Sequence, residues 1–389
     1  MKNAIRRALA WHCLPAAAKN EQRRDAAGLP SNDPGTDLVL PALMSWLCMA
    51  QDESASHDGG VARDYSLIRG WATSYPETTG YIIPTMLAYA RQTGLLEYRN
   101  RALRMANWLV SIQFRDGGFQ GGKVDSVPRV PVLFNTGQIL LGLAAAQADT
   151  GRYLEPMRRA ANWLVSVQDA DGCWRRYASP FAGAGERQYD THVAWGLFEA
   201  HRIDSSQGWG GAGLRNVRWA IGEMHSNGWL PKCCLDDDTR YPLTHTLGYA
   251  LRGILEAHRL SPEPTILDAA RRIADGLLSA LRDDGWLSGR LTSDWSAAGH
   301  WVCLTGTAQV AHCWLLLYRL TEHSVYLDAA RRANGYVRRT VALDGPIAQR
   351  GGVKGSFPIG GEYGRFQYLN WGTKFLADSL MLEAEFPVT

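Results

Sequence analysis

YRNRALRMANWLVSIQFRDGGF, residues Tyr98–Phe119, returns as YLEPMRRAANWLVSVQDADGCW, residues Tyr153–Trp174, an offset of 55 positions (153 minus 98). Both copies contain an Ala-Asn-Trp triplet, at Ala106–Trp108 and at Ala161–Trp163, and both run into an Asp-Gly turn. Self-similarity at a fixed period is typical of proteins built from repeated supersecondary units, so the search for further copies comes first.

The glycine turn recurs along the whole chain. Successive turn glycines, each preceded by Asp or Asn, are 58, 55, 56 and 57 positions apart, at Gly59, Gly117, Gly172, Gly228 and Gly285. A degenerate sixth copy covers Gly352–Phe357. One unit of this size therefore occurs six times.

Each unit contains two predicted helices of different character. One is apolar on nearly all faces, as in Gln138–Ala146, which predicts a helix buried on all sides. The other is amphipathic, as in Tyr153–Val167, where Arg158 and Arg159 form a charged face. The buried helices are expected at Tyr81–Gln92, Gly137–Ala148, His192–Ile203, Thr246–Leu260, Gly306–Leu320 and Asn370–Glu383.

Six buried helices alternating with six amphipathic ones predict an all-α fold, the (α/α)6 toroid of six helical hairpins. We expect residues 37–389 to form this single domain, after a polar and mobile lead-in over residues 1–36. An open solenoid of helix pairs is the alternative, and solenoid repeats are usually shorter and more uniform.

The composition excludes several classes of protein. A net charge of +3 does not indicate a nucleic-acid-binding protein. No run of the sequence reaches the ~20 apolar residues of a membrane span. The seven cysteines, with Cys233 and Cys234 adjacent, do not suggest a disulfide framework. We expect a cytoplasmic protein, with periplasmic export as the weaker alternative because the N-terminal apolar run is a poor signal peptide.

In a toroid, the segments that precede the inner helices, here called the rim segments, gather on one face. The N-termini of the inner helices point to the same face and favour an anionic ligand there. The candidate catalytic residues in the rim segments are Glu77, Asp190, His192, Arg240, Tyr241, His245 and Tyr249. The candidate substrate-binding residues are Tyr75, Tyr81, Asn135, Gln138, Tyr189, Trp195, His300, Trp301, Glu362, Tyr363, Asn370, Trp371 and Lys374.

Each type of candidate has a structural alternative. Glu77, Asp190 and Asn135 stand where they could cap the following helix. A histidine at the start of a buried helix, such as His192 or His245, is often a satisfied core residue. The tryptophans are either sugar-stacking platforms or core side chains.

Two further patterns carry alternative functions. The acidic run Asp236–Asp238 and the Gln-x-x-Asp-Gly-x-Trp pattern at Gln168–Trp174 resemble features of class II terpene cyclases, which protonate an alkene. The repeat pattern predicts a fold and not a reaction. Cys303, His312 and Cys313 share one predicted helix without the tight spacing of zinc ligands, so we expect no metal and no cofactor.

At the rim segments, the chain resembles the (α/α) toroid enzymes of uronic-acid polysaccharides over roughly residues 40–385. These are uronate polysaccharide lyases, unsaturated glucuronyl hydrolases and the catalytic domains of glucuronyl C5-epimerases. Tyr75–Tyr81 (YPETTGY), Pro242–Glu256 and Gly351–Phe375 also resemble poorly characterised bacterial exopolysaccharide-associated proteins. The resemblance implies a carbohydrate-active enzyme and an anionic polysaccharide or oligosaccharide as its substrate, and it transfers no catalytic residue.

Lyases and C5-epimerases both remove the proton next to the uronate carboxylate, which needs a base such as His or Tyr and groups that neutralise the carboxylate. Because such residues outnumber carboxylates in the rim segments, we expect proton abstraction, with a lyase favoured over an epimerase. A glycoside hydrolase with two carboxyl groups is the close alternative. A glycan-binding scaffold without catalysis is a further alternative.

Overall fold

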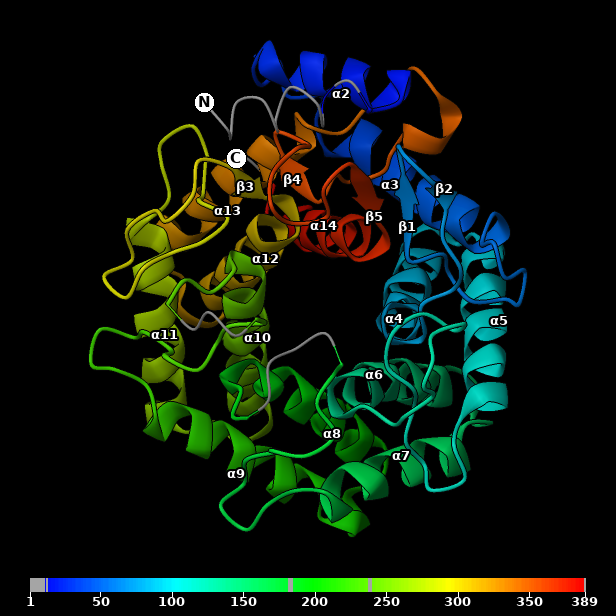
Figure 1. Cartoon of the computed structure of the whole chain (residues 1–389). Coiled ribbons are helices and arrows are strands. Elements are labelled where there is room, and N and C mark those ends of the chain that lie inside the picture. The colour runs from blue at the N-terminus through cyan, green and yellow to red at the C-terminus, as the bar shows by residue number, and fades with distance from the viewer. Residues whose placement is uncertain (1–10, 12, 181–184, 237–239, 388–389) are drawn as a thin grey trace.

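Two concentric rings of helices surround a central axis in the computed structural model, which describes residues 11, 13–180, 185–236 and 240–387 (Figure 1). The inner ring consists of α4 (Pro76–Thr93), α6 (Leu133–Thr150), α8 (Thr191–Ile203), α10 (Thr244–Leu260), α12 (Leu304–Thr321) and α14 (Asn370–Glu383). The outer ring consists of α3 (Thr36–Asp52), α5 (Leu96–Ile112), α7 (Leu154–Ser166), α9 (Trp209–Gly222), α11 (Pro264–Ser279) and α13 (Ser324–Arg338). The predicted (α/α)6 toroid is confirmed.

The ring is closed, which excludes the open solenoid. Each inner helix packs on the next along the chain, and α14 returns to pack on α4. Two hydrogen bonds join this last pair: Thr85 Oγ1 donates to Asp378 Oδ1 at 2.7 Å, and Asn370 Nδ2 donates to Thr78 Oγ1 at 2.8 Å. In this cyclic order of six, α4 and α10 stand opposite each other across the axis (Figure 1).

The repeated glycine turns have a packing reason. Gly117 has a φ of +103°, and a Cβ added there would lie 2.3 Å from the carbonyl oxygen of Arg159 in the next outer helix. Gln113 Nε2 donates to the carbonyl of Gly117 and to a carbonyl of α7, both at 3.0 Å. Gln168 makes the equivalent pair of bonds to Gly172 and to α9. The Gln–Gly pattern therefore fastens these two turns to the following repeat, and its likeness to terpene cyclases concerns the fold.

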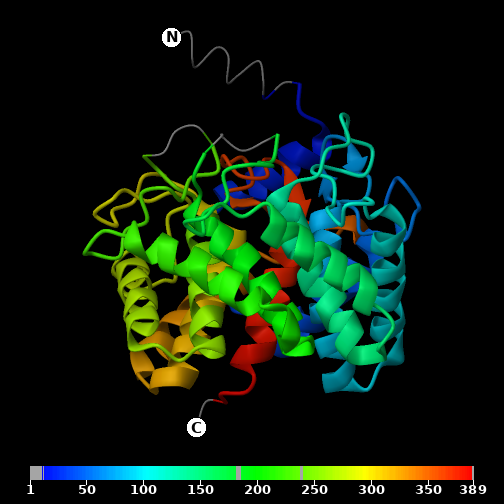
Figure 2. The same cartoon turned by 90° about the horizontal axis from the view of Figure 1, so that it is seen from below.

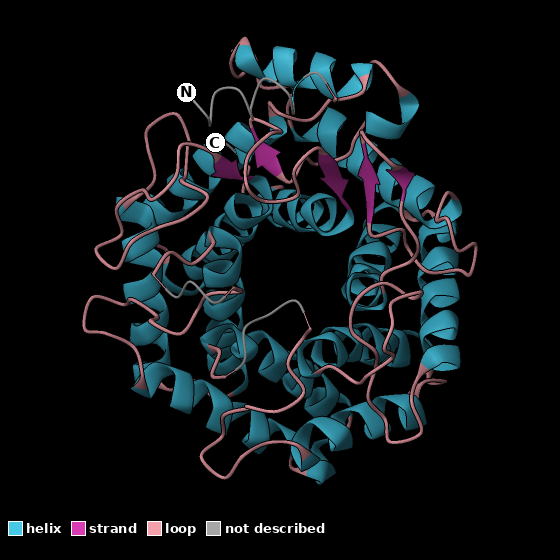
Figure 3. Cartoon of the chain, in the orientation of Figure 1, coloured by secondary structure: helices cyan, strands magenta, loops and turns pink. Residues whose placement is uncertain are grey.

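Short strands, which the sequence did not predict, lie among the loops at one end of the toroid, here called the loop face. β2 (Gly70–Trp71), β1 (Asp64–Ser66) and β5 (Gln367–Leu369) form one antiparallel sheet in that order, and β3 (Val302–Cys303) pairs with β4 (Ser356–Phe357) (Figure 3). The 3-10 helices are η1 (Gln188–Asp190), η2 (Ser205–Gln207) and η3 (Ile347–Gln349). These long connections collect at one end of the toroid, as the side view shows (Figure 2).

The N-terminal lead-in contains one more helix, α2 (Ala16–Ala26), where the polar composition suggested a mobile segment. Lys354 Nζ lies 2.8 Å from Glu21 Oε1 and 2.5 Å from Asp25 Oδ1, and all three side chains are almost fully buried. Polar residues of α2 thus pair with a buried charge from a distant loop, a contact that local sequence does not reveal.

Within the described ranges, no helix is long and apolar enough to cross a bilayer. All seven cysteines are free, and six of them are buried. Among the residues that the structure describes, no three His, Cys, Asp or Glu side chains cluster as metal ligands would.

Candidate active site

The loop face contains a cavity of about 570 Å³ at the centre of the ring. Rim segments of several repeats contribute to its wall. The predicted site residues that line it are Tyr75, Glu77, Tyr81, Asn135, Tyr189, His245, Tyr249, Tyr363 and Trp371. Nine of the twenty candidates from the sequence therefore meet in one place.

Glu77 lies in the first turn of α4, directly after Pro76, which favours a helix start at this point. Its carboxylate does not cap the helix; instead Tyr75 Oη donates to Glu77 Oε2 at 3.1 Å. Burial raises the pKa of Glu77 to about 7, although the Tyr75 hydrogen bond and the nearby Arg63 charge oppose the shift. Glu77 can therefore hold or release a proton near neutral pH.

His245 is the second residue of α10, and its ring lines the cavity while remaining 5% exposed. Nδ1 lies 2.6 Å from Oε1 of Gln309 in the neighbouring α12. Burial lowers the pKa of His245 to about 4, against a smaller upward effect of the Gln309 hydrogen bond. The imidazole is thus neutral above pH 4 and can accept a proton.

These two groups have pKa values in the reverse of their ordinary order. Between pH values of about 4 and 7, Glu77 is protonated and His245 is neutral. They come from α4 and α10, which face each other across the ring. A pair of titratable groups whose surroundings drive their pKa values in opposite directions is the usual mark of an acid and a base.

Several aromatic side chains line the same cavity. The Tyr249 ring lies 4.4 Å from the His245 ring, and its hydroxyl oxygen is 3.5 Å from that of Tyr81. Trp371 Nε1 donates to Tyr363 Oη at 2.9 Å, so the Tyr363 hydroxyl keeps its own proton for a ligand. Burial raises the pKa of both Tyr249 and Tyr363, and they stay neutral donors. Flat apolar faces with hydroxyl groups at their ends suit a sugar ring.

The cavity wall is basic, as an anionic ligand would require. Basic side chains outnumber acidic ones in the lining, with Arg63, Arg69, Lys123 and Arg187 against Asp64 and Glu77. The Arg63 guanidinium lies 2.7 Å from Asp64, so this carboxylate is already occupied. The sequence did not predict Arg63, Arg69 or Lys123 as site residues, because Arg63 and Arg69 lie beside strands β1 and β2, ahead of α4, and Lys123 lies in the α5–α6 loop.

Asp190 is a third carboxyl group near the cavity, after Glu77 and Asp64, but it does not line it. It is 1% exposed, and Arg187 Nε lies 3.3 Å from its Oδ2 atom. Burial raises its pKa to about 6, against the effect of Arg187. Asp190 therefore forms an ion pair with Arg187, and it is Arg187 that lines the cavity.

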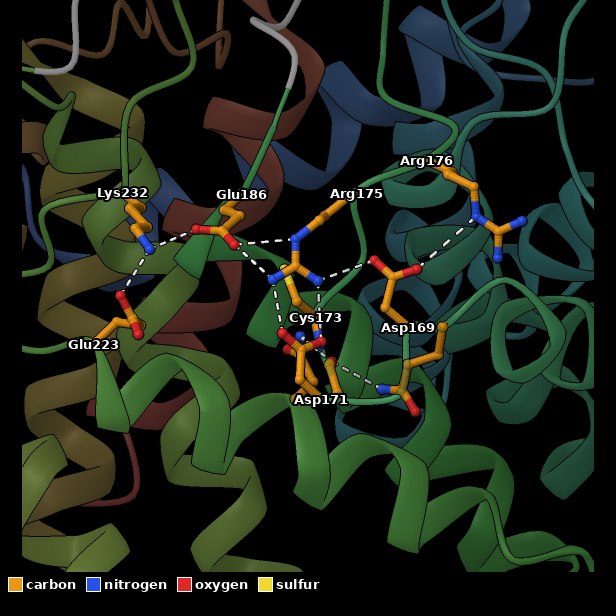
Figure 4. Close-up of polar contacts among 11 residues, drawn as sticks. Asp169, Asp171, Cys173, Arg175, Arg176, Glu186, Glu223 and Lys232 are labelled. Atoms are coloured by element: carbon orange, nitrogen blue, oxygen red, sulfur yellow. Dashed lines mark hydrogen bonds and ion pairs between the residues drawn. The ribbon is translucent and has the colours of Figure 1, made fainter.

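A surface network fixes the rim segment that carries Arg187 (Figure 4). Arg175 binds Asp169, Asp171 and Glu186, at 3.1, 2.7 and 2.6 Å. Lys232 connects Glu186 to Glu223 in the next repeat. Arg175 is therefore neutralised by protein carboxylates.

The other candidates from the sequence lie outside the lining, most of them in the packed interior. His192 is fully buried behind Tyr249, with Nδ1 2.6 Å from Gln138 Oε1. Lys374 is 2% exposed and binds Asp378 at 2.6 Å. Asn370 closes the ring as described above, Trp195 lies under the Arg252 guanidinium, and Trp301 packs on Leu243 and Cys303. Sequence position alone does not show whether a polar side chain in the first turn of an inner helix is packed between helices or lines the cavity.

The remaining candidates lie on the outer rim. His300, Arg240 and Glu362 are exposed, and Tyr241 is half-buried beside Arg240. Arg290 binds both Glu362 and Asp236, at 3.2 and 2.9 Å. Residues 237 and 238 of the acidic run fall outside the described ranges.

Solved structures show the same fold at low sequence identity. An unsaturated glucuronyl hydrolase specific for heparin is 15% identical and aligns with a TM-score of 0.72 over 90% of this chain and 98% of its own. Cellobiose 2-epimerase from Bacillus thermoamylovorans is 12% identical, with a TM-score of 0.68 over 93% and 98% of the two chains. A D-mannose isomerase is 13% identical, with a TM-score of 0.69 over 91% and 99%. The sequence matches no protein-family model and no curated protein.

Proposed function

We propose that this chain is an acid–base enzyme that acts on a sugar of an acidic saccharide, with His245 as the base and Glu77 as the acid. The observation that carries the proposal is the reversed order of their pKa values inside one cavity. Over the same pH range the carboxyl group has a proton to give and the imidazole can take one.

The basic wall supports a uronic acid or a similar anionic sugar as the substrate. Arg63 and Arg187 already pair with Asp64 and Asp190. Arg69 and Lys123 would therefore supply the positive charge that attracts the carboxylate, and the Asn135 amide lies in the same lining as a further polar contact. Neutralisation lowers the barrier to removal of the adjacent C5 proton because the intermediate is enolate-like. The negative charge of the bound substrate would also raise the pKa of His245 and make it a stronger base.

Two outcomes share this first step. In β-elimination, the C5–H and C4–O bonds break, a C4=C5 double bond forms, and Glu77 gives its proton to the leaving oxygen. In epimerisation, the C5–H bond breaks and a proton from Glu77 adds to the opposite face of C5. We favour epimerisation over the lyase reaction because the two groups come from opposite sides of the ring. The toroid also supports epimerisation in the cellobiose 2-epimerase named above.

Hydrolysis is the second candidate, supported by a protonated Glu77 that could act on a glycosidic oxygen. A two-carboxylate mechanism needs a partner that activates water. Asp64 is the other carboxylate in the lining, and it is bound to Arg63 at 2.7 Å. Because Asp64 is already paired with Arg63, we favour proton transfer at carbon over hydrolysis. The basic cavity likewise gives no support to a terpene cyclase, whose prenyl substrate needs an apolar funnel.

The test is incubation of the protein with uronic-acid oligosaccharides in D₂O. Deuterium at C5 with inversion, seen by NMR, is the expected result; absorbance of an unsaturated uronate would indicate elimination, and new reducing ends would indicate hydrolysis. Glu77→Gln and His245→Asn should each abolish deuterium incorporation. The exposed residues Glu97 and His323 provide matched controls, as Glu97→Gln and His323→Asn. If none of the three signals appears on any uronic-acid substrate, the proposed function is wrong.

A further inference from the structure

Two Gln–His pairs stand on either side of Tyr249 in the inner ring. Gln309 Oε1 lies 2.6 Å from His245 Nδ1, and Gln138 Oε1 lies 2.6 Å from His192 Nδ1. The centroid of the Tyr249 ring is 4.4 Å from each imidazole. The two pairs join the same two atoms at the same distance, but only His245 lines the cavity.

Close helix packing brings Gln309 to His245. A Cβ added at Gly248 of α10 would lie 2.9 Å from Gln309 Cβ, and one added at Gly306 of α12 would lie 2.5 Å from the backbone nitrogen of His245. Both contacts are shorter than real Cβ contacts, so only glycine permits this approach of α10 and α12. Gln309 is 4% exposed, and its side chain is therefore fixed within the wall.

The position of the proton on the His245 ring follows from the group that Nδ1 contacts, the amide oxygen of Gln309. An amide oxygen accepts a hydrogen bond, so Nδ1 of His245 carries the proton and Nε2 keeps its lone pair. Because Nδ1 is hydrogen-bonded to Gln309, Nε2 is the ring nitrogen that remains for a ligand in the cavity. A neutral amide does not stabilise an imidazolium as a carboxylate would, and the ring stays neutral.

We propose that Gln309 is a positioning residue that holds His245 in the Nδ1–H tautomer and so presents Nε2 to the cavity as a proton acceptor. Its effect on turnover rests on the proposed function, but the tautomer can be measured on the protein without any substrate.

The direct experiment is NMR of the whole chain labelled with ¹⁵N-histidine, in which two-bond ¹H–¹⁵N correlations distinguish the tautomers. His245→Asn and His192→Asn assign the two signals. The wild-type protein should show His245 as the Nδ1–H form. Gln309→Leu should give a mixture of tautomers, and Gln309→Glu should raise the pKa of His245 because a carboxylate stabilises the imidazolium. Observation of the Nε2–H form in the wild-type protein would overturn the proposal.

Gln138→Leu is the matched control. It removes an equivalent hydrogen bond from His192 and should leave the tautomer of His245 unchanged. An equal change of the His245 signal in both variants would mean a general loosening of the ring, and the proposal would then fail.

Kinetics provide the second readout. Because orientation of the base is lost, Gln309→Leu should lower kcat by about 10- to 100-fold and change KM by less than about threefold. In Gln309→Glu the acid limb of the pH–rate profile should move to higher pH. If no substrate is turned over while the tautomer is as expected, the proposed function fails and the role of Gln309 stands. If turnover is observed but the Gln309 variants match the wild-type enzyme, the role of Gln309 fails alone.

Discussion

Glu77 and His245 face one cavity from opposite helices of the inner ring, and burial moves their pKa values past each other, to about 7 and about 4. Burial disfavours the charged form of each group. A carboxylate loses its charge when it gains a proton, so burial raises its pKa, whereas an imidazolium loses its charge when it releases a proton, so burial lowers its pKa. One physical cause therefore produces both an acid and a base.

The first prediction concerns the pH dependence of activity. Below pH 4 His245 becomes protonated and stops accepting a proton, and above pH 7 Glu77 loses the proton that it should donate. The free-enzyme profile of kcat/KM should be bell-shaped, with limbs near these two values. A rate that rises steadily through pH 7 would instead make the Glu77 carboxylate the base.

The second prediction concerns stability. The folded-state pKa of Glu77 lies above its ordinary value of 4.5, so its contribution to stability is full below pH 4.5 and is lost as the pH rises through about 7. Glu77→Gln removes this titration. The variant should match the wild-type protein at pH 4.5 and exceed its free energy of unfolding at pH 8 by up to about 3 kcal/mol.

Urea unfolding at the two pH values measures the difference. Glu155→Gln, at a side chain that is 74% exposed, is the control and should show little change between them. An equal effect of Glu77→Gln at both pH values would contradict the raised pKa.

The third prediction tests the repeat turns. Gly172 has a φ of +93°, and a Cβ there would lie 2.6 Å from the backbone oxygen of Arg215. Gly172→Ala should therefore cost about 2–4 kcal/mol of stability. Gly151 has a similar φ of +74° with no atom within 4 Å of the added Cβ, so Gly151→Ala should cost only about 1–2 kcal/mol. Equal losses in thermal unfolding would show that backbone strain, and not packing, selects glycine at the turns.

The fourth prediction concerns the attachment of α2. Lys354→Met leaves Glu21 and Asp25 buried without their counter-charge, which should cost about 3–5 kcal/mol and increase hydrogen exchange in α2. Lys232 binds two carboxylates on the surface, so Lys232→Met should cost less than about 1 kcal/mol. Unchanged exchange in α2 of Lys354→Met would mean that other contacts hold this helix.

The fold could be predicted from the sequence because the repeat is local. Each Gln–Gly turn and each apolar helix is visible within one unit, and Asn370–Glu383 even has the boundaries of α14. The site was only partly predictable, since a side chain such as His192 occupies the same first turn as His245 but points behind Tyr249. The partners that set the chemistry are Arg63, which precedes Glu77 in the same repeat, and Gln309, which reaches His245 from the next repeat, and sequence spacing does not encode such contacts.

The last prediction tests the charge of the cavity. Lys123 lines the cavity and remains 41% exposed, with Asp125 at 3.6 Å as a weak partner. An exposed charge of this kind contributes on the order of 0.5–1 kcal/mol, so Lys123→Ala should weaken binding of a uronic-acid oligosaccharide about two- to fivefold. Salt should weaken wild-type binding, and less so in the variant, because part of the attraction is screened Coulomb energy. Calorimetry at two salt concentrations measures both effects. Arg104→Ala removes an exposed charge from the outer ring and should leave binding unchanged. Binding of the matching neutral oligosaccharide with equal affinity would remove the reason to assign an anionic substrate to this cavity.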